Sequence, residues 1–332
     1  MDFTSQDLTL SIDDFAERVL EPAMSQLATS VESDVLSGVA NQVYQQYGSA
    51  DSLATFTADP MKYFLQAKAI LNKSLTPKDN KRYALLNSIT MAGLVYGNKA
   101  LFQDASAISE GYLEGIVGRM SGLTFIENEL VNSHTLGVYS GTQWEIDASN
   151  IYGSTLTVTA EGGSATTMTE GTLFTIDGVY QVHPETKASY SNLQQFVILG
   201  TGSGHTAPTT TSWVISPPII PVGGVAGVYV PGMANVSNVP TNDVNINIIG
   251  TTALSYVNNL VYHKDFATFV TADLYMPKGG MEMAAREVYD GVSMRLLKGF
   301  DIINDIQISR FDVLYGYQII RPQLASRVYI AN

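Results

Sequence analysis

The sequence predicts an α+β fold. Three observations predict it: a long helical pattern near the N-terminus, a strand-rich middle, and a return to mixed helix and hairpin patterns at the end. We expect both ends of the chain to build one α+β body into which the middle is inserted. With 332 residues, 45% of them hydrophobic, the chain can bury a substantial core as one large domain or two smaller ones.

The strongest helical pattern runs from about Ser11 to Tyr47, with Ser11 as a good N-cap and Gly48 as a C-terminal stop. Pro22 is expected to kink or divide this helix. If continuous, the helix would span roughly 55 Å. We expect its apolar face to pack against the C-terminal hairpin. That face comprises Val19, Leu27, Val31, Val35 and Val39.

A second helix is predicted to begin at Asp59 and Pro60, because proline is favoured in the first turn of a helix. Leu75–Pro77 should end it, and Lys81–Leu94 has a mixed pattern. Four glycines then indicate a region of loops and short helices. They are Gly111, Gly115, Gly118 and Gly122.

The composition changes near Gly137, and from there to about Asn259 the chain is rich in Thr, Val, Ser and Gly. Short alternating runs predict β-strands in this part. The predicted strands are Leu156–Thr159, Leu173–Ile176, Phe196–Leu199, Trp213–Ile215 and Val244–Ile248. Glycine pairs predict turns between strands. The predicted turns are Gly162-Gly163, Asp177-Gly178 and Gly202–Gly204.

After Tyr262 the helical and mixed character returns. Met281–Tyr289 is predicted to form a short helix in which Glu282 pairs with Arg286. Val292–Phe300 and Ile306–Tyr315 are then predicted to pair as a hairpin. The alternation of apolar residues changes phase within the second strand, which predicts a bulge near Ser309-Arg310.

The charge composition favours association with other protein and argues against tight DNA binding. Only 15% of the residues are charged, and the net charge is −13. A tight nucleic-acid binder needs clustered Lys and Arg. The sequence has no Cys, which excludes disulfides and thiolate sites and suits a reducing cytoplasm. We find no signal peptide pattern. The uncharged stretch Trp213–Val230 is read as strands and loops because its prolines oppose a membrane helix.

Searches for catalytic and binding motifs lead to no catalytic, cofactor-binding or metal-binding residues, so we predict that the chain is not an enzyme and has no cofactor. Gly200–Gly204 follows a strand but lacks the lysine and the following helix of a phosphate loop, so a surface turn is predicted. Glu127 and Glu129 precede His134 in what reads as a solvated loop. The four histidines have no metal-ligand spacing. They are His134, His183, His205 and His263.

Stretches along nearly the whole chain resemble the major capsid (coat) proteins of P22-type tailed phages, which have the HK97-like fold. In family order they are Phe3–Phe15, Glu21–Ala23, Leu75–Tyr83, Gly118–Leu123, Asn132–Gly137, Leu173–Tyr180, His183-Pro184, Leu193–Val197, Thr271–Lys278, Tyr289–Arg295, Asp301–Asp305 and Arg310–Gly316. The resemblance implies a spine helix, peripheral and axial domains, and an inserted β-rich domain. Residues 1–136 would form the spine helix and the first part of the peripheral and axial body. Residues 137–259 would form the β-rich insertion with axial segments, and residues 260–332 the return to the body with the C-terminal hairpin.

The resemblance also implies a function. Hexamers and pentamers of this subunit would form an icosahedral head around double-stranded DNA, with only weak non-specific DNA contact and no membrane. A scaffolding protein and a portal would be the other partners, and the shell would be assembled in the host cytoplasm. Family members carry an N-terminal arm and an extended loop ahead of the spine helix, whereas this sequence begins almost at that helix. We expect truncation rather than a natural variant, and we expect this form to remain monomeric.

Three alternatives stay open from the sequence. A β-rich surface module that binds carbohydrate is compatible with the Thr- and Gly-rich middle, but it requires an aromatic groove, and the only tryptophans are Trp144 and Trp213. A shell subunit of a cellular nanocompartment would share the fold. An enzyme with an unfamiliar site would require a pocket of converging polar groups.

Overall fold

The computed structural model describes residues 2–4, 21–48, 52–98, 118–139, 143–147, 151–161, 166–200, 202–205, 209–225, 227–277, 279, 283–289, 291–304 and 306–331. The chain divides into two compact units. One comprises Met1–Val35 and Thr268–Gln318, and the other comprises Leu36–Ala267 and Ile319–Asn332. Mixed helices and sheets confirm the predicted α+β class.

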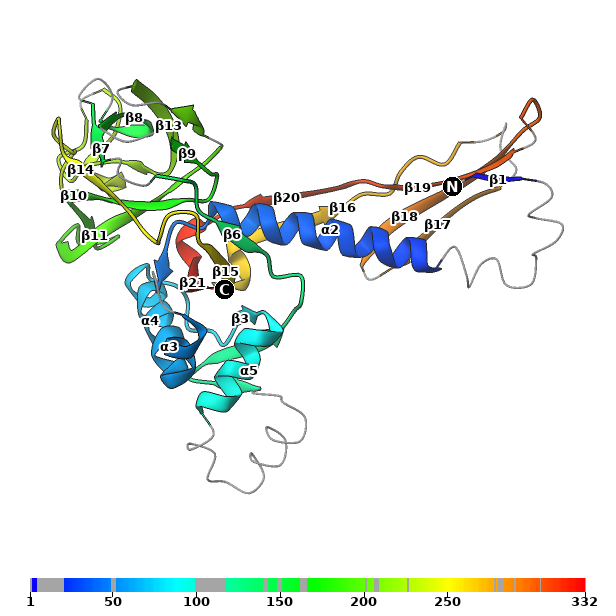
Figure 1. Ribbon diagram of the computed structural model, residues 1–332, viewed down its shortest axis with the longest axis horizontal. Coiled ribbons are helices and arrows are strands. Elements are labelled where there is room, and N and C mark those ends of the chain that lie inside the picture. Colours follow the sequence, from blue (N-terminus) through cyan, green and yellow to red (C-terminus); the bar gives the residue numbers. More distant parts are fainter. Residues whose placement is uncertain are drawn as a thin grey trace. The chain divides into compact units, whose positions relative to one another are not determined.

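The long helix α2 spans Glu21–Gln42 and contributes to both units (Figure 1). Pro22 lies in the first turn of its described part, where proline is tolerated. The predicted N-cap Ser11 and the apolar Val19 lie outside the described residues. Val31 and Val39 are buried, and Leu27 and Val35 are half-buried. Val39 belongs to the unit without the hairpin, so the packing of this face against the hairpin stays a prediction. In the unit that holds the hairpin, Asp34 of α2 accepts a hydrogen bond from the Tyr315 hydroxyl at 2.9 Å.

The helix ends at Gln42 and not at Tyr47, because its last residues leave the helix to join a sheet. Gln46–Tyr47 forms strand β2, which pairs in parallel with β21 (Ala325–Ala331). This sheet follows the order β2-β21-β15-β3-β5-β4, and β6 also pairs with β15. The other members are β15 (Ser255–His263), β3 (Arg82–Leu86), β5 (Leu123–Glu127), β4 (Arg119–Met120) and β6 (Ser133–Thr135).

Three short helices accompany this sheet, and their apolar side chains form a core with it. The predicted second helix is confirmed as α4 (Pro60–Lys73), which follows α3 (Leu53–Ala58) and precedes α5 (Ser88–Gly97). Phe64 and Leu71 of α4 are fully buried in one cluster with Val328 of β21. Asp59 occupies the cap position of α4, but its side chain makes no capping hydrogen bond. The region of glycines predicted as loops and short helices contains β4 and β5 in its described part.

Gly48 follows β2 in a backbone conformation that favours glycine. Its φ is +88°, and a Cβ atom there would lie 2.6 Å from the main-chain oxygen of Tyr329. We expect Gly48→Ala to destabilise the sheet by at least about 1–3 kcal/mol, because the backbone strain adds to the clash. Thermal denaturation followed by circular dichroism measures this loss. Gly299→Ala is the control, since a Cβ at Gly299 meets nothing within 4 Å; equal losses for both variants would contradict the steric explanation.

A closed antiparallel barrel occupies the Thr-rich middle and has the order β10-β11-β13-β8-β7-β14 (Figure 1, green). Its strands are β7 (Gln143–Ile146), β8 (Gly153–Glu161), β10 (Leu173–Val182), β11 (Ser189–Ile198), β13 (Thr209–Ile219) and β14 (Asn245–Ile248). All five predicted strands of this region fall in it. The barrel closes where β14 pairs with β10.

Two predicted turns of this region are wrong. Asp177-Gly178 lies inside β10, where a register shift against β11 absorbs the positive φ of Gly178. Gly202–His205 forms strand β12, which pairs with β9 (Thr166–Met168), so the glycines sit in a small ribbon rather than a turn. Gly162-Gly163 lies outside the described residues. Trp213–Val230 contains the end of β13 followed by loops, and no helix in the described part of the chain is both long and apolar enough to cross a membrane.

A four-stranded sheet with the order β1-β19-β18-β17 contains the predicted hairpin. Its strands are β1 (Asp2–Thr4), β17 (Met283–Tyr289), β18 (Val292–Asp301) and β19 (Ile306–Val313). The bulge predicted near Ser309-Arg310 is absent from the described strands, since β18 and β19 pair without a shift from Met294–Val313 to Asp301–Ile306. The sheet accommodates the phase change by burying Ser309 and exposing Ile308.

The helix predicted over Met281–Tyr289 is wrong, because β17 occupies the described part of this segment. All seven residues of β17 pair in register with β18. Glu282 lies outside the described residues, and Arg286 forms its ion pair with Asp273 at 3.0 Å. A separate two-stranded sheet joins β16 (Ala267–Thr271) to β20 (Tyr315–Ile319).

Candidate functional site

The described residues contain no group of three or more His, Cys, Asp or Glu side chains that could hold a metal ion. The three histidines with described side chains have separate structural partners. His134 contacts the main-chain oxygen of Glu170, His183 accepts hydrogen bonds from two neighbouring amides, and His263 bonds to Asp79 at 2.9 Å. Glu129 accepts a hydrogen bond from Ser88, the first residue of α5.

Both tryptophans lie inside the barrel rather than in an exposed groove. Trp144 and Trp213 are fully buried, with ring centroids 4.9 Å apart. Phe174 contacts Trp213 edge to face. Both tryptophans therefore belong to the barrel core, and the described surface of the barrel does not contain the tryptophan-lined groove that a carbohydrate-binding module requires.

The most distinctive polar arrangement lies where the barrel meets the seven-stranded sheet. Arg327 of β21 is 0% exposed, and its guanidinium bonds to groups from three segments. Its Nε donates to the main-chain oxygen of Val43 at 2.8 Å, and Nη2 donates to the same oxygen. Its Nη1 donates to the main-chain oxygen of Gly171 at 3.0 Å and to the hydroxyl of Tyr329 at 2.8 Å.

These bonds explain the local structure on either side of Arg327. Val43 follows α2, so its carbonyl is one of the groups that a helix end leaves without an internal partner. Gly171 precedes barrel strand β10 and has a φ of +86°. A Cβ atom at this position would lie 2.9 Å from the side-chain oxygen of Asn41. Arg327 therefore fastens the end of α2 and the entry of the barrel to the same strand of the sheet.

His134 lies beside this guanidinium and contacts the same barrel entry. It is 6% exposed, and Nε2 lies 2.7 Å from the main-chain oxygen of Glu170. A carbonyl can only accept, so Nε2 carries the proton and Nδ1 faces the Tyr329 hydroxyl at 3.5 Å. Burial and the nearby Arg327 charge lower the pKa of His134 to about 4. We call Arg327, His134 and Tyr329, together with the carbonyls of Val43, Glu170 and Gly171, the clasp.

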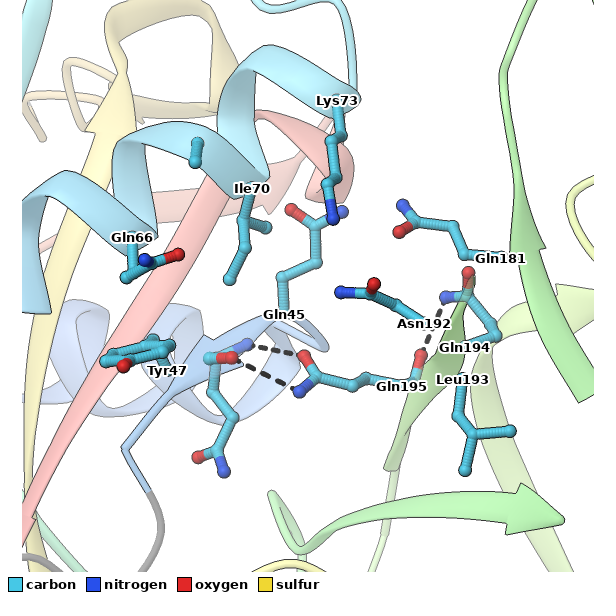
Figure 2. Close-up of a pocket in the computed structure, with 12 residues that line it drawn as sticks. Gln45, Tyr47, Gln66, Ile70, Lys73, Gln181, Asn192, Leu193, Gln194 and Gln195 are labelled. Carbon is cyan, nitrogen blue, oxygen red and sulfur yellow. Dashed lines mark hydrogen bonds between the residues drawn. The ribbon is translucent and has the colours of Figure 1, made fainter. Parts of the chain in front are cut away.

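A second contact beside the clasp is made by two glutamines. The amide of Gln195 in β11 accepts from the main-chain nitrogen of Gln46 at 2.7 Å and donates to the main-chain oxygen of Gln46 at 3.2 Å. Figure 2 shows both bonds. Lys73 of α4 also lies over the ring of Tyr190 in β11, 5.5 Å from its centroid.

A polar cavity of about 230 Å³ lies next to these glutamines (Figure 2). Its lining includes one charged side chain, Lys73, and seven carboxamides. The carboxamides are Gln45, Gln46, Gln66, Gln181, Asn192, Gln194 and Gln195. An apolar cluster lies on the side of the clasp. It includes Leu173 and Val197 of the barrel and Tyr256 and Tyr329 of the sheet. The joint thus combines a small apolar contact with polar bonds.

Sequence reasoning missed the clasp. Its members are distant in the chain, and the one local signal was a lone arginine within an apolar strand pattern, Ala325–Ala331. An arginine in the middle of a buried strand requires several carbonyl or carboxylate partners. The pattern could therefore have indicated a buried polar contact, but it could not have named Val43 or Gly171.

The other notable feature is an exposed apolar turn at the tip of the β18–β19 hairpin. Ile302 is 85% exposed and Ile303 is 92% exposed. The turn is fixed by Asp301, whose carboxylate accepts from the main-chain nitrogen of Ile303 at 2.9 Å and from the side-chain amide of Asn304 at 2.7 Å. Two isoleucines are thus presented to solvent on an ordered turn.

Comparison with known proteins identifies the family. The family model described as P22 coat protein, gene protein 5, matches residues 2–327. No curated protein sequence matches this chain. Similar solved structures include one from Mycobacterium phage Che8, with 12% identity and a TM-score of 0.46, which covers 99% of this chain and 68% of that chain. The asymmetric unit of the bacteriophage PhiM1 mature capsid has 14% identity and a TM-score of 0.48, covering 100% and 69%.

The CUS-3 coat protein I-domain has 28% identity and a TM-score of 0.22, covering 35% of this chain and 95% of that chain. All three TM-scores are below 0.5, so the assignment depends on the family model, which spans nearly the whole chain and agrees with the resemblance seen in the sequence. Neither the carbohydrate-binding module nor the nanocompartment shell is favoured by it. The chain belongs to the P22 coat protein family and is a structural subunit of a bacteriophage head.

Proposed function

We propose that this coat protein forms hexamers and pentamers that build an icosahedral head around double-stranded DNA. The observation that carries the proposal is the family match over residues 2–327. Weak interfaces repeated over a closed shell give a stable lattice, because each subunit is held by several neighbours at once. Assembly would take place in the host cytoplasm, with a scaffolding protein and a portal as partners.

The negative charge of the chain supports a shell that encloses DNA without binding it tightly. The net charge is −13, so the packaged DNA would make only weak, non-specific contact with the shell. We also propose that the chain has no catalytic activity of its own. We further propose that the chain is divided into three parts: a spine-helix body (1–136), a β-rich insertion (137–259) and a returning body (260–332).

Electron microscopy of the chain, extended at its N-terminus by the arm and extended loop of its family and co-expressed with a scaffolding protein from the same phage, tests the assembly. We expect closed shells of uniform curvature, with sixfold and fivefold capsomers in averaged images. Soluble monomers with scaffolding protein present, at every protein concentration tried, would contradict the proposal.

The exposed hairpin tip is our proposed contact between subunits. Buried apolar side chains near the centre of an interface carry much of its binding energy. Ile302 and Ile303 would supply such a contact, and the hydrogen bonds of Asp301 fix the turn before a neighbour binds, which lowers the entropy cost of association.

We expect the double variant Ile302→Asp/Ile303→Asp to fold normally but to lose shell assembly. Both side chains are almost fully exposed in the subunit, so their replacement should change the free energy of unfolding by no more than about 0.5 kcal/mol. In an interface, each buried carboxylate without a partner would be strongly unfavourable. Sedimentation velocity measures the fraction of protein in shells.

The matched control is Ile302→Leu/Ile303→Leu, which keeps the apolar area and should keep assembly. Normal shells from the Asp variant would exclude the tip as a contact without affecting the family assignment. A failure of wild-type protein to assemble would instead count against the proposed shell itself.

A further inference from the structure

The polar cavity of Figure 2 adjoins a second cavity of about 290 Å³. Gln181 and Gln194 of the barrel line both cavities. Gln45 connects the two linings, because it lines the first cavity and its Nε2 donates to the hydroxyl of Ser74, in the second lining, at 2.8 Å. We call the two cavities together the seam. The seam has the size of an ordinary ligand pocket, roughly 300–1,000 Å³.

The seam is lined by carboxamides and lysines and by no carboxylate. Lys73 belongs to the first lining and Lys187 to the second. Lys187 donates to the main-chain oxygen of Ala234 at 2.9 Å. Lys73 is half-buried, lies over the ring of Tyr190 and forms no ion pair within the described part of the chain. An aromatic ring attracts a cation but does not neutralise it, so this ammonium favours an anionic group beside it.

The carboxamides of the seam are able to recognise a peptide main chain. Gln195 already does so within this chain, because it accepts from the main-chain nitrogen of Gln46 and donates to the oxygen of the same residue, as a neighbouring strand would. Each further carboxamide has the same donors and acceptors. Figure 2 shows Gln66 of α4 on one side of the first cavity and Gln181 and Asn192 of the barrel on the other. An extended segment between them would meet carboxamides on both sides.

One carboxamide of the seam also has an acceptor without a donor. Gln45 is 3% exposed, and its Oε1 has no hydrogen-bond partner among the described residues. Buried acceptors are nearly always paired, so this oxygen favours an occupant that donates N–H groups. A phosphate, free or in a nucleic-acid backbone, only accepts hydrogen bonds, so it would suit Lys73 but not Gln45. A peptide with a carboxylate supplies both the negative charge and the donors.

We propose that the seam binds an extended, acidic peptide segment of a partner protein. Lys73 takes a carboxylate of the segment, and the surrounding carboxamides pair with its main-chain N–H and C=O groups. The bound segment contacts the barrel and α4 at once, beside the clasp. This site lies within one subunit, so the inference does not depend on the proposed shell.

Fluorescence anisotropy of the full-length protein tests the proposal with a labelled, blocked six-residue peptide of alternating Thr and Asp. We expect this peptide to bind about 10-fold or more tightly than the same peptide with Asn in place of Asp, since hydrogen bonds to charged groups are the stronger ones. A labelled thymidine tetranucleotide carries the same charge on its three phosphates and should bind more weakly than the Asp peptide. Raising the salt concentration should weaken the binding of the Asp peptide more than that of the Asn peptide.

Lys73→Gln should remove most of the preference for Asp over Asn, a change that a purely structural role of Lys73 would not produce. Lys62→Gln is the matched control, because Lys62 is an exposed lysine of the same helix outside both linings. Carbodiimide cross-linking, which joins a lysine to a carboxylate in contact with it, should attach the Asp peptide to Lys73 rather than to Lys62.

Three results with the wild-type protein would overturn the proposal, even if Lys73→Gln fails to fold. They are equal affinity for the Asp and Asn peptides, tighter binding of the tetranucleotide, and cross-linking mainly at Lys62. Absence of measurable binding by the Asp peptide at millimolar concentration would overturn it as well.

Discussion

Arg327→Ala is expected to destabilise the seven-stranded sheet by about 3–5 kcal/mol. The substitution removes a fully buried side chain and leaves a cavity at the joint. It also leaves the carbonyls of Val43 and Gly171 without their donors, and each unsatisfied buried acceptor costs about 1–3 kcal/mol. Urea denaturation followed by far-ultraviolet circular dichroism measures the loss.

Two further variants separate the hydrogen-bond network from simple loss of volume. Arg327→Lys keeps the charge and most of the volume but cannot reach Val43 and Gly171 with a planar fork of donors, so about half of the loss should remain. Arg321→Ala, at an exposed position, should change stability by less than about 0.5 kcal/mol. A stable Arg327→Ala protein would show that the guanidinium is not needed to hold the joint.

The elements that could be predicted from the sequence are those set by local pattern. Pro60 marked the start of α4, and most of its apolar residues at helical spacing are buried, namely Tyr63, Phe64, Ala67 and Leu71. The five predicted strands of the six-stranded barrel had alternating or continuous apolar runs, and the alternation agrees with the observed burial of Leu156 and Val158. The hairpin was predictable because its two strands and the turn after Phe300 are adjacent in the chain.

The segment Met283–Tyr289 shows why other elements could not be predicted. It contains two alanines, Arg286 and Glu287, which favour helix as isolated residues. In the protein, every residue of the segment pairs with β18, so contacts with a neighbouring strand override the local preference. The end of α2 follows the same logic, because Gln46 and Tyr47 pair with β21 about 280 residues further along the chain.

The joint could not be predicted for a related reason. Arg327 and its partner Val43 are 284 residues apart, and Arg327 and Gly171 are 156 residues apart. Nothing in the sequence near any of them specifies the other two. Composition indicated a self-associating protein without a catalytic motif, but buried hydrogen bonds between distant segments become visible only once the sheet and the barrel are placed together.

Trp213→Ala is expected to destabilise the barrel by about 3–5 kcal/mol, the usual cost of truncating a large buried aromatic side chain. Trp213 lies on β13 opposite Leu156 and contacts both Trp144 and Phe174, with ring centroids 4.9 and 5.5 Å away. Since one side chain touches strands β7, β10 and β8, no single neighbour can move in to fill the space. Guanidinium denaturation followed by the remaining fluorescence of Trp144 reports on the barrel alone.

Val214→Ala is the matched control, because the next residue of the same strand points outwards and is 49% exposed. Its loss of apolar contact should cost less than about 0.5 kcal/mol. If the barrel is a separate cooperative structure, Trp213→Ala should lower its transition midpoint and leave the main transition of the seven-stranded sheet nearly in place. If instead both transitions fall together, the clasp and the Gln46–Gln195 bonds couple the barrel to the sheet strongly enough for them to unfold as one.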